Sequence, residues 1–258
     1  SIRRRQRQMC IRDRATASTG VFGVRNTGVG SGNYGVCWDL VLYSNKITWR
    51  IGDTGYNTVQ QSTALADNTW THVVGVADGE NMFLYINGVK EAATNTYTAP
   101  IETPTNRIHI ATDGSNNSWE FKGMLDEAAI FNYGLSEAQV NQIYNNGLAA
   151  NLTSLSPINW WRLGEDAYFV NNNITIPNQV AGGDSCTGSG TQTSMLVADA
   201  PGSYGSGSGV NLDIVDRVGE APGTSPINVG NSQSYNMIPD DRHGYVPGYV
   251  PAQVNNVA

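Results

Sequence analysis

Hydrophobic and polar residues alternate through most of the first half of the chain, which is the pattern of β-strands with one buried face. At 36–43, Val, Trp and Leu side chains fall on one face, while Asp39 and Tyr43 fall on the other. A turn at residues 44–45 leads into a second alternating stretch at 46–51. We therefore expect these two stretches to form a β-hairpin.

The alternation continues at 68–91, where Asn87-Gly88 supplies the positive φ angles of a type I′ hairpin turn. Two further strands are predicted at 106–112 and 119–131. Many short strands joined by hairpins predict an all-β fold, an antiparallel sandwich or jelly roll. Three tryptophans that alternate with Leu, Ile or Val are expected in its core: Trp38, Trp49 and Trp70.

One short helix is predicted after the last of these strands. Ser136 and Gln139 have the spacing of a capping box, and Leu135 and Val140 have that of a hydrophobic staple. Gly147 is placed to end the helix in a left-handed cap. We expect the helix to pack across one edge of the sandwich.

Two motifs in this region resemble a known family. The run at 68–91 is similar to a Trp-His strand followed by a Tyr-x-Asn-Gly hairpin, and the run at 121–147 is similar to the family's last strand and helix. The resemblance is to laminin-G-like domains of the concanavalin A-like lectin/glucanase superfamily. It implies a jelly-roll sandwich over residues 15–150, truncated at its N-terminal end because the family's opening strands are absent.

The first fourteen residues differ in charge from the rest of the chain. They contain six Arg and one Asp, whereas the whole chain of 258 residues has a formal charge of −7. The segment 1–14 is predicted to be a basic leader or a non-native segment resembling translated sequencing-adapter sequence, and to contribute nothing to the fold. The acidic remainder argues against nucleic-acid binding, and no apolar run is long enough for a membrane span.

Residues 151–258 form a tail rich in Gly, Ser and Asn, in which an Asn-Met/Leu-x3-Asp-Arg-x-Gly pattern recurs after 25 residues. The pattern contains turn residues but few large apolar ones, so we expect residues 185–258 to be loosely ordered. The tail resembles C-terminal regions of structural proteins from marine bacterial viruses. That resemblance implies a virion or extracellular surface, with other virion or surface subunits as partners.

Asp126 and Glu127 are the acidic pair that invites comparison with glycosidases. Catalysis needs two carboxylates on the same side of a sugar, whereas adjacent strand residues point to opposite faces. The Glu-x-Asp-x-x-Glu pattern of laminarinase-type enzymes occurs nowhere in the chain. We therefore predict a binding protein and not an enzyme.

Sugar binding would use aromatic rings with neighbouring amides. The candidates are Trp119, with Asn116 and Asn117 beside it, and Tyr56 in the loop at 52–58. For Trp119 the alternative is an ordinary structural role.

Calcium is the candidate cofactor, because carboxylates and backbone oxygens gathered at a sandwich edge suit a hard cation. Its predicted ligands are Asp126, by the family resemblance, and Asp113 in an oxygen-rich loop. The alternatives are that Asp126 caps backbone amides and that the loop is a polar surface turn. The three cysteines, Cys10, Cys37 and Cys186, allow at most one disulfide, and Cys37 is predicted to be a buried free thiol.

The predicted function is therefore a carbohydrate-binding or adhesion module in a viral or cell-surface protein, with a glycan or cell-surface ligand. Two alternatives remain: a purely structural or oligomerising virion domain, and an accessory binding domain of a secreted enzyme. An exposed aromatic cluster beside a calcium-competent loop would favour the first function.

Overall fold

The computed structural model describes most of the chain up to residue 189 and two short strands beyond it. Among these residues, no helix has the length and apolar character needed to cross a membrane. The described residues are 5–13, 18–25, 36–52, 56–66, 69–98, 101, 108–111, 121, 123–147, 149–163, 168–170, 173–189, 196–197 and 209–211.

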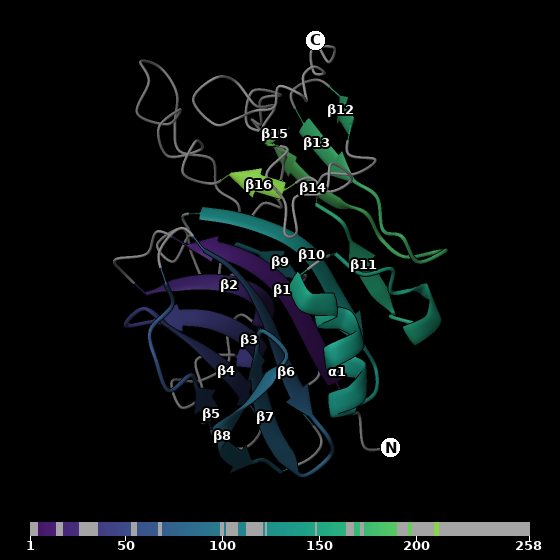
Figure 1. The fold of residues 1–258 in the computed structure, drawn as a ribbon. Coiled ribbons are helices and arrows are strands. Elements are labelled where there is room, and N and C mark those ends of the chain that lie inside the picture. Colours follow the sequence, from purple (N-terminus) through teal and green to yellow (C-terminus); the bar gives the residue numbers. More distant parts are fainter. Residues whose placement is uncertain are drawn as a thin grey trace.

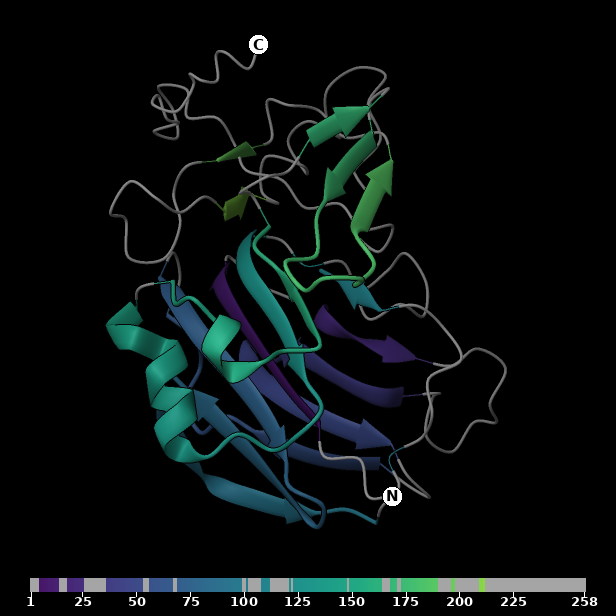
Figure 2. The ribbon, with the colours of Figure 1, turned by 90° about the vertical axis from the view of Figure 1, so that its right-hand side faces the viewer.

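The strands form three antiparallel sheets, two of which face one another as a sandwich (Figures 1 and 2). The larger has the order β15-β16-β10-β1-β6-β7-β8, with β11 also paired to β10. Its strands are β1 (Arg5–Asp13), β6 (Trp70–Ala77), β7 (Asn81–Ile86), β8 (Val89–Thr96), β10 (Gly123–Phe131), β11 (Asn159–Trp161), β15 (Leu196–Val197) and β16 (Gly209–Asn211). The five-stranded sheet has the order β5-β4-β3-β2-β9, with β2 (Thr19–Arg25), β3 (Val36–Tyr43), β4 (Lys46–Gly52), β5 (Tyr56–Gln60) and β9 (His109–Ile110). The third sheet contains β12 (Tyr168–Val170), β13 (Asn173–Ile176) and β14 (Cys186–Ser189).

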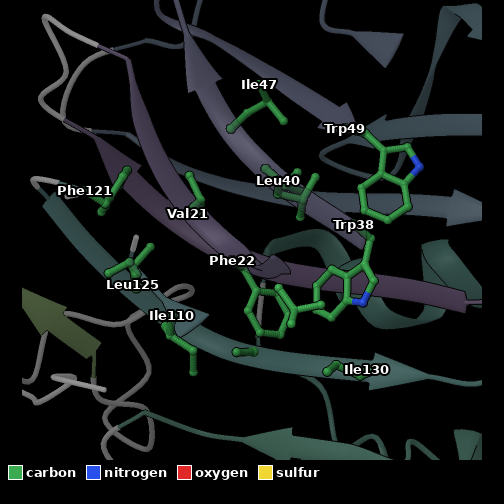
Figure 3. Close-up of a cluster of buried hydrophobic side chains, with 14 of the residues drawn as sticks. Val21, Phe22, Trp38, Leu40, Ile47, Trp49, Ile110, Phe121, Leu125 and Ile130 are labelled. Atoms are coloured by element: carbon green, nitrogen blue, oxygen red, sulfur yellow. The ribbon is translucent and has the colours of Figure 1, made fainter. Parts of the chain in front are cut away.

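The main hydrophobic core lies between the two large sheets (Figure 3). Alternation along β3 and β4 sends their Trp, Leu and Ile side chains into it, and Trp38 and Trp49 are almost completely buried. Phe22 meets Trp38 edge to face, with 5.5 Å between the ring centroids. The predicted core positions of these two tryptophans are confirmed, whereas Trp70 is only partly buried and belongs to neither core cluster.

Both predicted hairpin turns are present. Ser44 and Asn45 have φ angles of 53° and 59°, and Asn87 and Gly88 have φ angles of 50° and 80°. Positive φ at both central positions is the requirement of a type I′ turn, whose twist matches that of the flanking strands. The register of both hairpins therefore follows directly from the sequence.

The helix α1 (Glu137–Tyr144) begins with the predicted capping box between Ser136 and Gln139. Its end differs from the prediction, because the residue that enters the left-handed region directly after it is Asn145, with φ 44°. Gly147 is also left-handed but lies at the end of the short 3-10 helix η1 (Asn145–Gly147). Asparagine tolerates this conformation well, so the glycine is not needed at the cap.

A second hydrophobic cluster lies on the outer side of the larger sheet. Val74 and Val76 of β6 and Ala129 and Phe131 of β10 pack there beneath α1 and the segment that follows it. That segment includes the 3-10 helix η2 (Thr153–Leu155). The outer side of the larger sheet is therefore covered, and α1 lies on the opposite side of the sandwich from the five-stranded sheet (Figure 2).

The segment Arg5–Asp13 lies inside the larger sheet as β1. It pairs with β10 on one side and with β6 on the other, so this sheet has no open edge at that place. This differs from our expectation that residues 1–14 contribute nothing to the fold. The physical reason is that a central strand needs backbone hydrogen bonds on both sides, which any non-proline residue supplies. The origin of the segment stays a prediction.

The core continues beyond residue 150, where we expected the sandwich to end. Trp161, Leu163, Ile174, Ile176 and Cys186 belong to the same hydrophobic cluster as the strands of the sandwich. Cys37 and Cys186 are both buried, as predicted for Cys37.

The tail also contributes to the larger sheet, since β16 pairs with Met124 and Leu125 of β10. The described part of 185–258 is therefore partly in strands, which sequence composition did not predict. Of the repeated pattern, only Asn211 falls within the described residues.

Candidate ligand-binding face

Four of the predicted site residues, Asp113, Asn116, Asn117 and Trp119, lie outside the described residues. The two ends of the segment that carries them are placed. The backbone N–H of Phe121 donates to the carbonyl of Ala111 at 2.9 Å, and the N–H of Ala111 donates to the carbonyl of Val21. The segment 112–120 is therefore rooted at the β9 edge of the five-stranded sheet.

Tyr56 belongs to the same sheet but to its other end. Tyr56 is the first residue of β5 and stands opposite Gly52 of β4 in the register. Ala111, which precedes segment 112–120, lies beside Val21, toward the end of the sheet that carries the 44–45 turn. Four residues of strand separate these two levels, about 13 Å. The structure does not bring Tyr56 to the root of the segment that carries Trp119.

Asp126 and Glu127 are arranged differently from the prediction that they point to opposite faces. The pairing of β10 with β1 shifts between Gln8 and Cys10, and Glu127 has a φ of 54°, so a β-bulge interrupts the alternation here. Asp126 and His72 both pair with Cys10 of β1, one from each side, so they lie on the same face of the sheet. The His72 ring contacts Tyr144 of α1. Both acidic residues therefore lie on the helix-covered side of the larger sheet.

Glu127 is held by two residues of the segment after the helix. Its carboxylate accepts hydrogen bonds from Trp160 Nε1 at 2.6 Å and from Arg162 Nε at 2.9 Å. Burial raises the pKa of Glu127, and the Arg162 guanidinium and both hydrogen bonds oppose that rise. The contacts identify Glu127 as a residue that fastens β11 to β10.

Burial excludes these two acids as an accessible catalytic pair in this arrangement. Asp126 is fully buried and Glu127 is 3% exposed, so a sugar cannot reach them without displacing the covering layer. Across the residues that the structure describes, no three His, Cys, Asp or Glu side chains form a group suited to a metal ion. Asp113 lies outside those residues, so the calcium site stays a prediction.

The outward side of the five-stranded sheet has a different character, and we call it the polar face. At its centre, the Arg50 guanidinium makes a two-point ion pair with the Asp39 carboxylate across β3 and β4, at 2.5 Å for each contact. Both side chains are almost completely buried although they lie on the outward side. The polar face consists of Asp39, Val41, Tyr43, Lys46, Thr48, Arg50, Thr58 and Gln60.

The absence of a side chain at Gly23 makes room for this ion pair. It stands opposite Asp39 in the register, and a Cβ at its position would lie 2.2 Å from Asp39 Cβ. His109 stands on the other side of Gly23, so a polar row crosses the sheet from His109 to Thr58. Only glycine leaves room for the carboxylate at this point, and sequence patterning gave no sign of that requirement.

The exposed part of the polar face lies toward the 44–45 turn. Tyr43 is 51% exposed, and Lys46 and Gln60 are partly exposed. Gln60 Nε2 donates to Thr48 Oγ1 at 2.8 Å, and Lys46 Nζ donates to the Ser62 carbonyl at 2.7 Å. An exposed ring therefore lies beside oriented amide and ammonium groups.

The helix-covered side of the larger sheet carries His72, a titratable residue that makes the free energy of unfolding depend on pH. Complete burial lowers the pKa of His72 to about 4, whereas an unfolded histidine titrates near 6.5. The unfolded chain therefore binds more protons below pH 6.5, and the folded state loses stability as the pH falls toward 4. We expect a loss of about 3 kcal/mol over this range from this residue.

The measurement is urea unfolding of wild type and His72→Gln between pH 7.5 and 4. The variant is expected to be less stable at pH 7.5, because it loses the ring contact with Tyr144, but to show a shallower fall with acid. Tyr168→Ala, which removes a half-exposed ring far from any histidine in the sequence, serves as the control and should keep the wild-type slope. An unchanged slope in His72→Gln would contradict the assignment.

Antiparallel two-sheet sandwiches of this kind occur in lectin domains and in viral capsid proteins. The family model described as the concanavalin A-like lectin/glucanases superfamily matches residues 12–141. This is half of the chain, and the chain belongs to that superfamily. No curated protein matches the chain.

Several solved structures share the fold at low sequence identity. A "putative carbohydrate binding protein" from Bacteroides ovatus has a TM-score of 0.57 and 15% identity, and the match covers 72% of this chain and 52% of that one. Domain 4 of an extracellular GH43 arabinanase from Geobacillus stearothermophilus, in complex with arabinotriose, has a TM-score of 0.45 and 18% identity, with 56% of this chain and 68% of that one covered. The chain thus spans about half the length of the Bacteroides protein, and these likenesses concern the fold alone.

Proposed function

We propose that the protein is a non-catalytic carbohydrate-binding module whose glycan lies on the polar face. The observation that carries this proposal is the contrast between the two outer sides of the sandwich. The larger sheet is covered by α1 and by residues after it, whereas the five-stranded sheet presents Tyr43, Lys46 and Gln60 to solvent. Sugars need this combination of an aromatic ring with hydrogen-bonding groups.

The non-catalytic part of the proposal rests on the burial of the acidic pair. Asp126 and Glu127 are occupied with packing beneath the covering layer, and Glu127 is already bound to Trp160 and Arg162. Membership of a superfamily whose name includes both lectins and glucanases is compatible with either activity. The exposed residues of the polar face support binding.

The setting that we propose is an extracellular or virion surface. Support comes from the resemblance of the tail to structural proteins of marine bacterial viruses. In that setting the glycan or cell-surface ligand would be the partner. Calcium held by Asp126 and Asp113 remains part of the proposal as a structural cofactor.

The experiment is affinity electrophoresis of the full chain in gels that contain arabinan, xylan, mannan, laminarin or polygalacturonate, each run with calcium and with chelator. We expect retardation by at least one polysaccharide, and no release of reducing sugar from it. Retardation that disappears in chelator supports the calcium site, and retardation that persists contradicts it. If no polysaccharide and no glycan on an array binds, the proposed function is wrong.

A further inference from the structure

We propose that Tyr43 is the aromatic platform of a site for a neutral sugar, with Lys46 and Gln60 as its hydrogen-bonding partners. The inference rests on the proposed function and places the ligand at one end of the polar face. Sequence reasoning had placed Tyr43 on the outward side of its strand but had not considered it as a ligand-binding residue.

The hairpin fixes where the ring stands. Leu42 is fully buried in the core, so the next residue along β3, Tyr43, faces outward. Tyr43 pairs directly with Lys46 across the two-residue turn. Since directly opposed residues have Cβ atoms about 5 Å apart, the ring and the ammonium-bearing chain are neighbours. The rigid type I′ turn holds both without a long loop.

The polar neighbours are oriented before a ligand arrives. Thr48 Oγ1 accepts from Gln60 Nε2, which fixes the amide and leaves its oxygen to accept from a sugar hydroxyl. Lys46 gives one N–H to the Ser62 carbonyl, and an ammonium group has two more to donate. A glycan chain that lies over Tyr43 and continues across β4 toward β5 would thus meet both a donor and an acceptor, which its hydroxyl groups require.

The charge balance favours a neutral sugar. The two strongest charges of the polar face, Asp39 and Arg50, are paired with one another and almost completely buried. Lys46 is then the one remaining charged residue among those that define this face, and its ammonium is already hydrogen-bonded. Recognition of an acidic polysaccharide needs an unpaired or forked cation such as arginine, and Arg50 is engaged with Asp39.

The other exposed apolar residues of the described chain lack this setting. Tyr168, 52% exposed, lies on β12 of the three-stranded sheet, Val89 is the first residue of β8, and Ile158 precedes β11. Isolated exposed residues of this kind are normal on protein surfaces. Tyr43 differs because it shares its face with oriented polar groups.

The test compares Tyr43→Ala with the matched control Tyr168→Ala in the full chain. Both remove an exposed tyrosine ring, so both should retain the wild-type melting temperature within error. With whichever neutral polysaccharide retards the wild type, we expect Tyr43→Ala to weaken binding about tenfold or more, as for a buried aromatic contact in an interface. Gln60→Ala should weaken binding less, and Tyr168→Ala should bind as wild type does.

The outcomes separate this inference from the proposed function. Full binding by Tyr43→Ala together with loss of binding by Trp119→Ala would overturn the Tyr43 site while leaving a carbohydrate-binding module. Retardation of the wild type by polygalacturonate alone would overturn the neutral class of sugar. If the wild type binds no glycan, the proposed function fails and the Tyr43 site fails with it.

Discussion

Replacing Trp161 by alanine is expected to destabilise the whole sandwich by about 3–5 kcal/mol, the usual cost of removing a buried tryptophan. Trp161 lies twenty residues beyond the end of the superfamily match, yet it is 5% exposed and belongs to the main core. Its ring meets Phe22 of β2 edge to face, with 6.4 Å between the centroids. The indole N–H donates to the Asp184 carbonyl at 3.0 Å.

The loss should be global because Trp161 joins parts of the chain that are far apart. It pairs with Ala128 of β10 in the sheet and forms a bridge with Asn178, while Phe22 belongs to the opposite sheet. Removing the indole therefore leaves a cavity between elements that unfold together. Urea unfolding followed by tryptophan fluorescence and by far-UV circular dichroism should show one coincident transition at lower urea.

Tyr168→Ala is the matched control, since its aromatic ring is half exposed and its loss should change the free energy of unfolding by less than about 0.5 kcal/mol. A Trp161→Ala variant as stable as wild type would show that residues beyond 150 are dispensable. The expected boundary of the sandwich at residue 150 would then stand as a folding boundary.

Local patterns predicted the hairpins and the start of the helix, because these depend on residues close together in the sequence. The type I′ turns at 44–45 and 87–88 and the capping box at Ser136 each need only two or four residues. The core positions of Trp38 and Trp49 followed from alternation alone. The sandwich class of the fold was therefore accessible from the sequence and from the family resemblance.

Features that depend on pairing between distant segments were not accessible in this way. The bulge at Glu127 puts Asp126 and Glu127 on the same side of the sheet, whereas alternation predicts opposite sides. The position of Glu127 is recognised through its contacts with Trp160 and Arg162. The position of β1 between β6 and β10 also depends on partners about sixty and one hundred and twenty residues away. Composition suggested a loosely ordered tail because large apolar residues are few there. Composition does not show which of these residues pack against a core that other parts of the chain form.

The candidate site shows the same division. Alternation placed Asp39 and Tyr43 on the outward face, but only the register across three strands brings Lys46, Thr48 and Gln60 beside them. The search for ligand-binding residues in loops selected Trp119 and Tyr56, whereas the exposed tyrosines that the structure describes, Tyr43 and Tyr168, lie in strands. A binding site on a sheet face is assembled by pairing, so it leaves little trace in any one segment of sequence.

Arg50→Met is expected to lower the free energy of unfolding by about 3–5 kcal/mol, the usual cost of removing one partner of a buried ion pair. The Asp39 carboxylate is fully buried and receives both contacts from the forked guanidinium. Methionine keeps much of the side-chain volume but leaves the carboxylate without that compensation. Because water cannot replace the lost donors at a buried site, the folded state bears the desolvation cost.

The double variant Asp39→Asn/Arg50→Gln distinguishes the cost of a stranded charge from the cost of altered packing. It removes both charges and keeps polar groups of similar shape, so it should be more stable than Arg50→Met when both are measured by urea unfolding. Lys46→Met provides the control for loss of a cation on the same face, and its effect should stay within about 1 kcal/mol because the ammonium is partly exposed. If Arg50→Met and Lys46→Met cost the same, the pair does not stabilise the polar face, and the centre of the proposed binding surface is held by packing alone.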